Sequence, residues 1–139
     1  MKAIIVSGYF NPLHVGHLEL LQAAKKEGDI LIVIVNSDMQ RYLKGSKEFM
    51  LEDERLKIIK ALSVVNHALL SIDIDKTQIE TLKELQATYG GVYQLAFANG
   101  GDQTNKSIPE TDICNELGIE LIDGLGKKIQ SSSWLLDKK

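Results

Sequence analysis

The chain has 139 residues, a length that fits one compact domain because domains usually hold roughly 100 to 150 residues. Hydrophobic residues make up 44% of the chain and charged residues 25%, which indicates a folded globular protein rather than a disordered or disulfide-rich one. The net charge of −3 argues against nucleic acid as a partner, since such binding needs a broad positive surface. We therefore predict a single domain over residues 1–139, in which any anionic ligand meets a local basic cluster.

Apolar segments and cysteine content bear on the cellular location. The longest apolar run, residues 30–35, is far shorter than the roughly 20 residues that cross a bilayer. The first residues lead directly into Ser7 and Gly8 without a long apolar segment, and the single cysteine, Cys114, has no internal partner for a disulfide. We expect a cytoplasmic protein that makes no membrane contact, with Cys114 serving in packing.

Strands and helices alternate along the chain. Short apolar, β-branched runs predict strands at residues 2–6, 30–35, 67–72, 92–98 and 119–122. Amphipathic spacing and end signals predict helices at residues 15–27, 51–62, 76–89 and 109–117, and a last helical turn that begins at the serines 131–133. This order predicts an α/β, Rossmann-like, doubly wound parallel sheet of about five strands. Ligands bind such sheets beyond the carboxyl ends of the strands.

Two histidines, His14 and His17, stand at the start of the first predicted helix. On a helical wheel they project toward the protein rather than toward bulk water. Imidazoles at a helix N-terminus, with Gly16 leaving space for close approach, would bind a phosphate, and the phosphate would raise their pKa. Two other interpretations stay open: core histidines bonded to backbone groups, or a two-histidine metal site without an evident third ligand.

Basic residues follow the second predicted strand. Residues 41–47 carry Arg41, Lys44 and Lys47 around Gly45, and predict either a loop that closes over a polyphosphate or a solvated surface loop. Arg55 lies on the apolar stripe of the next helix, where a guanidinium needs an anion to offset its desolvation. We expect Arg55 either to reach the ligand or to pair with a buried carboxylate.

Two further segments could approach a nucleotide. Paired glycines before Asp102 would let the backbone approach a base or ribose, with Asp102 holding a hydroxyl or a cation, although this is also ordinary turn chemistry. The serines Ser131, Ser132 and Ser133 offer hydroxyls and backbone N–H groups at a helix start, suited to a phosphate or simply to an N-cap.

The segment from Gly8 through His14-Val15-Gly16-His17 resembles the HxGH signature of the cytidylyltransferase-like nucleotidyltransferases. The resemblance extends over nearly the whole chain. Further matches fall in the order seen in glycerol-3-phosphate cytidylyltransferase and in the nucleotidyl domain of ADP-heptose synthase: residues 36–38, 44–45, 52–55, 100–102 and the closing serines.

That resemblance implies transfer of CMP or AMP from a nucleoside triphosphate to a small phosphorylated polyol or sugar, with release of pyrophosphate. It assigns His14 and His17 to the triphosphate and the transition state, Lys44 to the phosphates, and Arg55 to the acceptor or to closing contacts. It places in the nucleotide site Gly8, Tyr9, Phe10, Gly16, Gly101, Asp102, Ser131, Ser132 and Ser133. Mg²⁺ would accompany the triphosphate without a metal site of the protein's own, and a homodimer is the assembly that the resemblance implies.

Alternatives remain within and outside this family. Archaeal-type FAD synthetases and phosphopantetheine adenylyltransferases belong to the same wider group, so CTP or ATP and the acceptor stay open. The chain has Gln103 where relatives commonly have Arg, Lys127-Lys128 where they have Arg-Thr, and Asn11-Pro12 where many have an acidic and an apolar residue. Because glutamine cannot neutralise charge, a nucleotide-binding module without turnover is the alternative of another class.

Overall fold

Five parallel strands form the centre of the molecule, in a computed structural model that describes residues 1–45, 47–100 and 108–125. In chain order they are β1 (Lys2–Gly8), β2 (Ile30–Val35), β3 (His67–Leu70), β4 (Gln94–Gly100) and β5 (Glu120–Leu125). Their order across the sheet is β3-β2-β1-β4-β5, so the strand order reverses between β1 and β4. The predicted α/β doubly wound sheet of five strands is confirmed.

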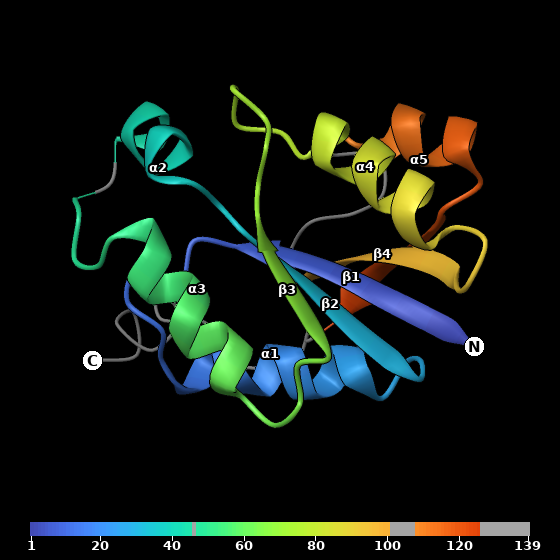
Figure 1. Cartoon of the computed structure of the whole chain (residues 1–139), viewed down its shortest axis with the longest axis horizontal. Coiled ribbons are helices and arrows are strands. Elements are labelled where there is room, and N and C mark those ends of the chain that lie inside the picture. The colour runs from blue at the N-terminus through green and yellow to red at the C-terminus, as the bar shows by residue number, and fades with distance from the viewer. Residues whose placement is uncertain (46, 101–107, 126–139) are drawn as a thin grey trace.

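Helices cover both faces of this sheet (Figure 1). On one face lie α1 (Val15–Lys25) and α3 (Glu52–Ala61), and on the other lie α4 (Ile79–Tyr89) and α5 (Thr111–Leu117). Side chains alternate along β1, so Ile4 packs in the core cluster that contains Leu21 of α1, while Ile5 packs in the cluster that contains Leu82 of α4. Two buried faces explain why the strands are apolar throughout.

A short helix that the sequence analysis missed, α2 (Asp38–Lys44), follows β2. The Ser37 side chain accepts a hydrogen bond from the Gln40 backbone N–H, and the Gln40 side chain accepts one from the Ser37 N–H, which together form a capping box. Gly45 ends the helix in the left-handed conformation with a φ of 84°. The predicted loop over residues 41–47 is therefore wrong for its first four residues.

Other helix boundaries also differ from the prediction, among them the starts of α4 and α5 and the end of α1, which lies at Lys25 rather than at residue 27. Helix α4 begins at Ile79 rather than at residue 76, because the buried Asp73 carboxylate accepts the backbone N–H groups of Glu80 and Thr81 in its first turn. Helix α5 begins at Thr111 rather than at Pro109. The last helical turn predicted at the serines 131–133 lies outside the described residues.

Gly118 ends α5 with a φ of 74°, a conformation that a residue with a Cβ adopts at a cost of roughly 1–2 kcal/mol. Gly118→Ala should lower the free energy of unfolding by about that amount, measured by urea denaturation. Gly91→Ala is the matched control, because Gly91 has no left-handed φ and a Cβ there would have no atom within 4 Å. Equal unfolding midpoints for the two variants would contradict the backbone explanation.

Within the described part of the chain, no helix has both the length and the apolar character of a membrane span.

Candidate active site

A cavity of about 390 Å³ opens where β1 ends and α1 begins. Its lining residues come from the segment between these two elements, from α1 and from the last turn of α2: Tyr9, Phe10, Asn11, Pro12, His14, His17 and Lys44. The structure thus brings together both histidines, the lysine and two of the residues expected around the nucleotide. This cavity is the place where a polyanion can meet several donors at once.

The two histidines form the N-cap of α1 with each other. His14 is the N-cap residue, and its Nδ1 accepts the Gly16 backbone N–H at 3.0 Å. The Nδ1 of His17 accepts the His14 backbone N–H at 3.2 Å, and the ring centroids lie 3.9 Å apart. A neutral imidazole that accepts at Nδ1 carries its proton on Nε2. Both half-buried rings therefore keep an Nε2–H donor for a ligand, although they also make the backbone contacts that the sequence left as an alternative.

His17 is held in its neutral form. Burial, as the largest cause, and the neighbouring His14 and Lys44 together lower the pKa of His17 from 6.5 to about 4. The sequence analysis expected a bound phosphate to raise this pKa, and a phosphate would act against these three causes. In the protein without ligand, the imidazole donates hydrogen bonds rather than carrying charge at neutral pH.

We expect the His17 ring resonances in an NMR titration to stay unchanged from neutral pH down to about pH 5, and to move only as the pH approaches 4. Because the pKa is lower in the folded state than the unfolded value of 6.5, the unfolded state binds the proton first as the pH falls. The stability that neutral His17 contributes is thus present above pH 6.5 and is lost toward pH 4. A midpoint near 6.5 in the folded protein would contradict this.

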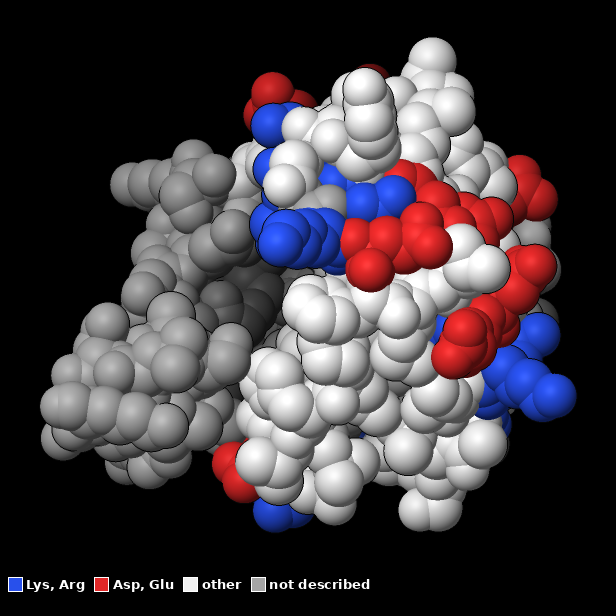
Figure 2. Space-filling model, turned by 90° about the vertical axis from the view of Figure 1, so that its left-hand side faces the viewer, with Lys and Arg blue, Asp and Glu red and all other residues white. Residues whose placement is uncertain are grey.

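Lys44 brings positive charge to the cavity from the C-terminal end of α2. Its Nζ lies 4.4 Å from the centroid of the Tyr9 ring, a cation–π contact that holds the ammonium at the cavity lining. Figure 2 looks onto the side of the molecule that carries α2 and α3, and shows Lys and Arg atoms gathered directly beside Asp and Glu atoms. One such pair joins Arg41 of α2 to Glu48 at 3.5 Å. Of the basic residues expected around an anionic ligand, Lys44 is the one that lines the cavity in the described part of the chain.

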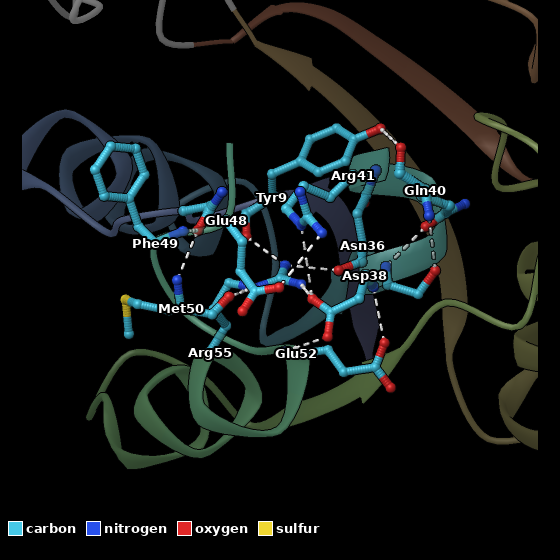
Figure 3. A network of polar contacts seen from close by, with 12 residues as sticks. Tyr9, Asn36, Asp38, Gln40, Arg41, Glu48, Phe49, Met50, Glu52 and Arg55 are labelled. Carbon is cyan, nitrogen blue, oxygen red and sulfur yellow. Dashed lines mark hydrogen bonds and ion pairs between the residues drawn. The ribbon is translucent and has the colours of Figure 1, made fainter. Parts of the chain in front are cut away.

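Arg55 of α3 is buried in a polar network (Figure 3). Its Nη2 pairs with the Asp38 carboxylate at 2.7 Å, and its Nη1 donates to the backbone oxygens of Tyr9 and Asn36, both at 2.7 Å. Its Nε donates to the Met50 backbone oxygen at 3.0 Å. With a fully buried side chain, Arg55 makes the internal ion pair that the sequence left open, and it does not line the cavity.

The Arg55 network therefore positions the residues that reach the cavity. It joins the end of β1, the end of β2, the first residue of α2 and the segment that precedes α3. Tyr9 and Lys44, which extend from two of these elements, depend on it for their placement. The sequence analysis did not identify Asp38 as the partner of Arg55, although its position three residues after a buried strand was the available signal.

Asn11 fixes a second segment beside the cavity. Its Oδ1 accepts the backbone N–H groups of Phe49 and Met50, both at 2.9 Å, and its Nδ2 donates to the Lys47 backbone oxygen at 2.6 Å. The sequence marked Asn11 only as a departure from relatives. In the structure this side chain ties residues 47–50 to the segment that carries His14.

Gly8 and Phe10 support His17 from inside the protein. A Cβ on Gly8 would lie 2.7 Å from the Phe10 ring, and the buried Phe10, with a φ of 51°, meets the His17 ring edge-on at 5.2 Å between centroids. The glycine is therefore required for the packing of Phe10. Of the other expected nucleotide-site residues, Gly16 lies in the first turn of α1. Outside the described residues are Gly101, Asp102, Ser131, Ser132 and Ser133.

Two other chemistries were considered for this chain. In the part that the structure describes, no three His, Cys, Asp or Glu side chains form a group that could hold a metal ion, so the two-histidine metal interpretation gains no third ligand there. Cys114 is fully buried, and burial together with Glu110 raises the pKa of its thiol to about 12. A thiol in this state packs and does not act as a nucleophile.

Comparison with known proteins gives one family. A family model described as cytidylyltransferase-like matches residues 5–122. A protein named bifunctional protein HldE from Citrifermentans bemidjiense is 39% identical over 99% of this chain, and the HldE of Geobacter metallireducens is 31% identical over 99%. The chain spans about a quarter of the length of these relatives, 27% and 26% respectively.

Two further similarities cover nearly the whole of the compared proteins. A protein named FAD synthase from Methanocorpusculum labreanum is 29% identical over 99% of this chain and 95% of its own length. The crystal structure of a lipopolysaccharide core biosynthesis protein from Thermoplasma volcanium superimposes with a TM-score of 0.64 and 28% identity, over 89% of this chain and 94% of that one. The structural similarity agrees with the fold described above.

Proposed function

We propose a reaction from the finding that this chain belongs to the cytidylyltransferase-like family and is therefore an enzyme of the nucleotidyltransferase class. The chain transfers CMP or AMP from a nucleoside triphosphate to a phosphorylated polyol or sugar. The observation that carries the proposal is the convergence of His14, His17 and Lys44 on one cavity at the carboxyl end of β1. The description of the structural neighbour as a lipopolysaccharide core biosynthesis protein supports a sugar as the acceptor.

The reaction makes one bond and breaks one. A phosphate oxygen of the acceptor attacks the α-phosphorus of the triphosphate, and the bond from that phosphorus to the oxygen that bridges to the β-phosphate breaks. The electron pair of the broken bond leaves with pyrophosphate. No covalent enzyme intermediate forms, because the acceptor oxygen itself attacks the phosphorus. Mg²⁺ enters as part of the nucleoside triphosphate substrate.

The protein's own contribution is placement and charge stabilisation. The Nε2–H groups of His14 and His17 donate to the phosphate oxygens on which negative charge increases in the transition state. The Lys44 ammonium offsets charge on the phosphates of donor or acceptor. Arg55 holds the surrounding segments in place and so lowers the entropic cost of bringing the reactants together.

The test is pyrophosphate release by the purified protein. CTP and ATP are each supplied with Mg²⁺ and a panel of acceptors that includes glycerol 3-phosphate, aldose 1-phosphates and FMN, with controls that lack acceptor or nucleotide. We expect release that depends on both substrates and on a polyol or sugar phosphate. Binding of nucleotide without release for any acceptor would instead support the nucleotide-binding module.

A second candidate is synthesis of FAD, which requires transfer of AMP to FMN. It is favoured by one observation: the relative named FAD synthase matches this chain over 95% of its own length, whereas the HldE relatives match over about a quarter. Pyrophosphate release with ATP and FMN, but with no sugar or polyol phosphate, would select this candidate.

A further inference from the structure

Helix α2, which carries Lys44, has no apolar face in the core. Of its seven residues, all of which the structure describes, Gln40 alone is buried. The large apolar side chains of the helix are exposed: Met39, Tyr42 and Leu43. Because a helix in a folded protein is usually fixed by the burial of an apolar stripe, the position of α2 depends on polar contacts instead.

The Gln40 side chain joins α2 to a segment that is distant in the sequence. Its exposed fraction is 0%, and its Nε2 donates to the backbone oxygens of Asp75 at 2.8 Å and of Thr77 at 3.0 Å. Its Oε1 accepts the Ser37 backbone N–H at 3.0 Å in the capping box. The nitrogen and the oxygen of this amide thus both have partners, as a buried polar group requires. These contacts bind α2 to the residues that lead from β3 into α4.

Lys44 lies on the same face of α2 as Gln40, because residues four positions apart in a helix are neighbours on its surface. Gln40 occupies the protein side of the helix, and Lys44, one turn later, lines the cavity together with His14 and His17. Tyr9 contacts both residues of α2: its ring lies 4.4 Å from the Lys44 Nζ, and its hydroxyl lies 3.5 Å from the Gln40 backbone oxygen (Figure 3). A turn of α2 would therefore move the ammonium away from the cavity.

Arg55 and Gln40 hold α2 at two different points. Arg55 pairs with Asp38, the first residue of the helix. Gln40 lies further along α2 and bonds to the segment between β3 and α4. A helix held only at its start could still turn about that point, whereas a second contact with a different segment restrains the turn. The contacts of Gln40 therefore set the orientation of α2, and with it the direction in which Lys44 extends.

From this geometry we propose that Gln40 is a positioning residue, which holds α2 in the orientation that keeps the Lys44 ammonium beside a polyanion in the cavity lined by His14, His17 and Lys44. Gln40 is not among the lining residues of that cavity, so it acts on the polyanion through Lys44. The proposal rests on the proposed function, because that function gives Lys44 its phosphate ligand. The placement of Lys44 can nevertheless be measured without turnover.

Two measurements on the whole chain test the proposal. Tripolyphosphate, a polyanion without base, sugar or acceptor, is titrated into the protein and its binding is followed by calorimetry. The NMR resonances of the Lys44 Cε protons report the placement of the ammonium, since the Tyr9 ring beneath it should shift them upfield. We expect Gln40→Met, which removes the amide and keeps the length of the side chain, to weaken tripolyphosphate binding at least about fivefold and to remove most of the upfield shift.

Combination with Lys44→Met separates positioning from a general loss of structure. If Gln40 acts through Lys44, adding Gln40→Met to the Lys44→Met variant should weaken tripolyphosphate binding by less than about twofold. Gln86→Met is the matched control, because it makes the same substitution in α4 and outside the cavity lining. This control should keep the wild-type affinity and the wild-type Lys44 resonances.

Gln40→Glu gives a second variant if Gln40→Met does not fold. It keeps an acceptor for the Ser37 N–H, so the capping box stays complete, but it loses the donor to the backbone oxygens of Asp75 and Thr77. We expect the same loss of tripolyphosphate affinity and of the Lys44 shift. A direct repulsion between the new carboxylate and the polyanion would persist in the Lys44→Met variant, which distinguishes it from positioning.

Three results would overturn the proposal: unchanged tripolyphosphate affinity in the folded Gln40 variants, unchanged Lys44 resonances in them, or an equally large loss of affinity when Lys44 is already replaced. The proposed function fails on a different measurement, the absence of pyrophosphate release. If tripolyphosphate binding depended on Gln40 through Lys44 and no pyrophosphate were released, the function would be rejected and the positioning role of Gln40 would be supported.

Discussion

Replacing His17 by Ala is expected to reduce turnover by more than about 10²-fold while the protein still folds. The variant loses the Nε2–H donor in the cavity lined by His14, His17 and Lys44. It also loses the Nδ1 acceptor that caps α1. Loss of the cap alone should cost only about 1 kcal/mol of stability. Pyrophosphate release measures the first effect, and thermal unfolding measures the second.

Two substitutions at the same position separate these effects. His17→Asn keeps a polar atom near the place of Nδ1 and can still cap the helix, whereas His17→Gln extends an amide toward the place of Nε2. We expect the Asn variant to be folded and inactive, and the Gln variant to keep more activity. His67→Ala is the control, because this half-buried imidazole stacks on Tyr89 at 5.1 Å in a different part of the fold. An unchanged rate in His17→Ala would remove the histidine from the mechanism.

The largest effect on stability is expected for Arg55→Met. Removing one partner of a buried ion pair usually costs about 3 to 5 kcal/mol, since the remaining charge loses its compensation. Here Asp38 would keep only the more distant Arg41 at 4.0 Å as an ion-pair partner, and the backbone oxygens of Tyr9, Asn36 and Met50 would lose their donors. Urea denaturation should show the loss in the free energy of unfolding.

Lys57→Met is the control for this variant, because Lys57 is exposed on the same helix and should change stability little. Arg55→Lys should also be destabilised, since an ammonium cannot make the two-sided contact of a planar guanidinium. In Arg55→Lys, at a temperature where it remains folded, we also expect a raised KM for the triphosphate, because Tyr9 and Lys44 lose their placement. Full stability with lost nucleotide affinity would instead make Arg55 a direct ligand contact.

Features that depend on neighbouring residues in sequence were predictable. Strands covered on both faces are apolar throughout, so β1 and β2 were located from composition alone. The histidines were found because a helix start and an inward-facing stripe are visible in the sequence from Gly8 to Ala24. Helix α2 was missed because the residues of its capping box, Ser37 and Gln40, are also common in loops.

Features that depend on distant residues were not predictable. Arg55 donates to Tyr9, 46 positions away, and Gln78 donates to Glu110, 32 positions away, and nothing in either local pattern specifies those partners. The sequence indicated that the guanidinium of Arg55 is buried and needs an anion, but only the fold shows that Asp38 supplies this anion. A further cavity of about 260 Å³ was missed for the same reason, since Asn36, Gln78 and Glu110 in its lining come from three separate segments.

The use of His17 Nδ1 as a helix cap has a consequence for calorimetry. An imidazolium carries a proton on both nitrogens, so a charged His17 could no longer accept the backbone N–H of His14. The start of α1 would then lose this capping hydrogen bond. Capture of a nucleotide at neutral pH should therefore leave this ring uncharged. His17 should then add nothing to the dependence of the binding heat on the ionisation enthalpy of the buffer, because it takes no proton from the solution.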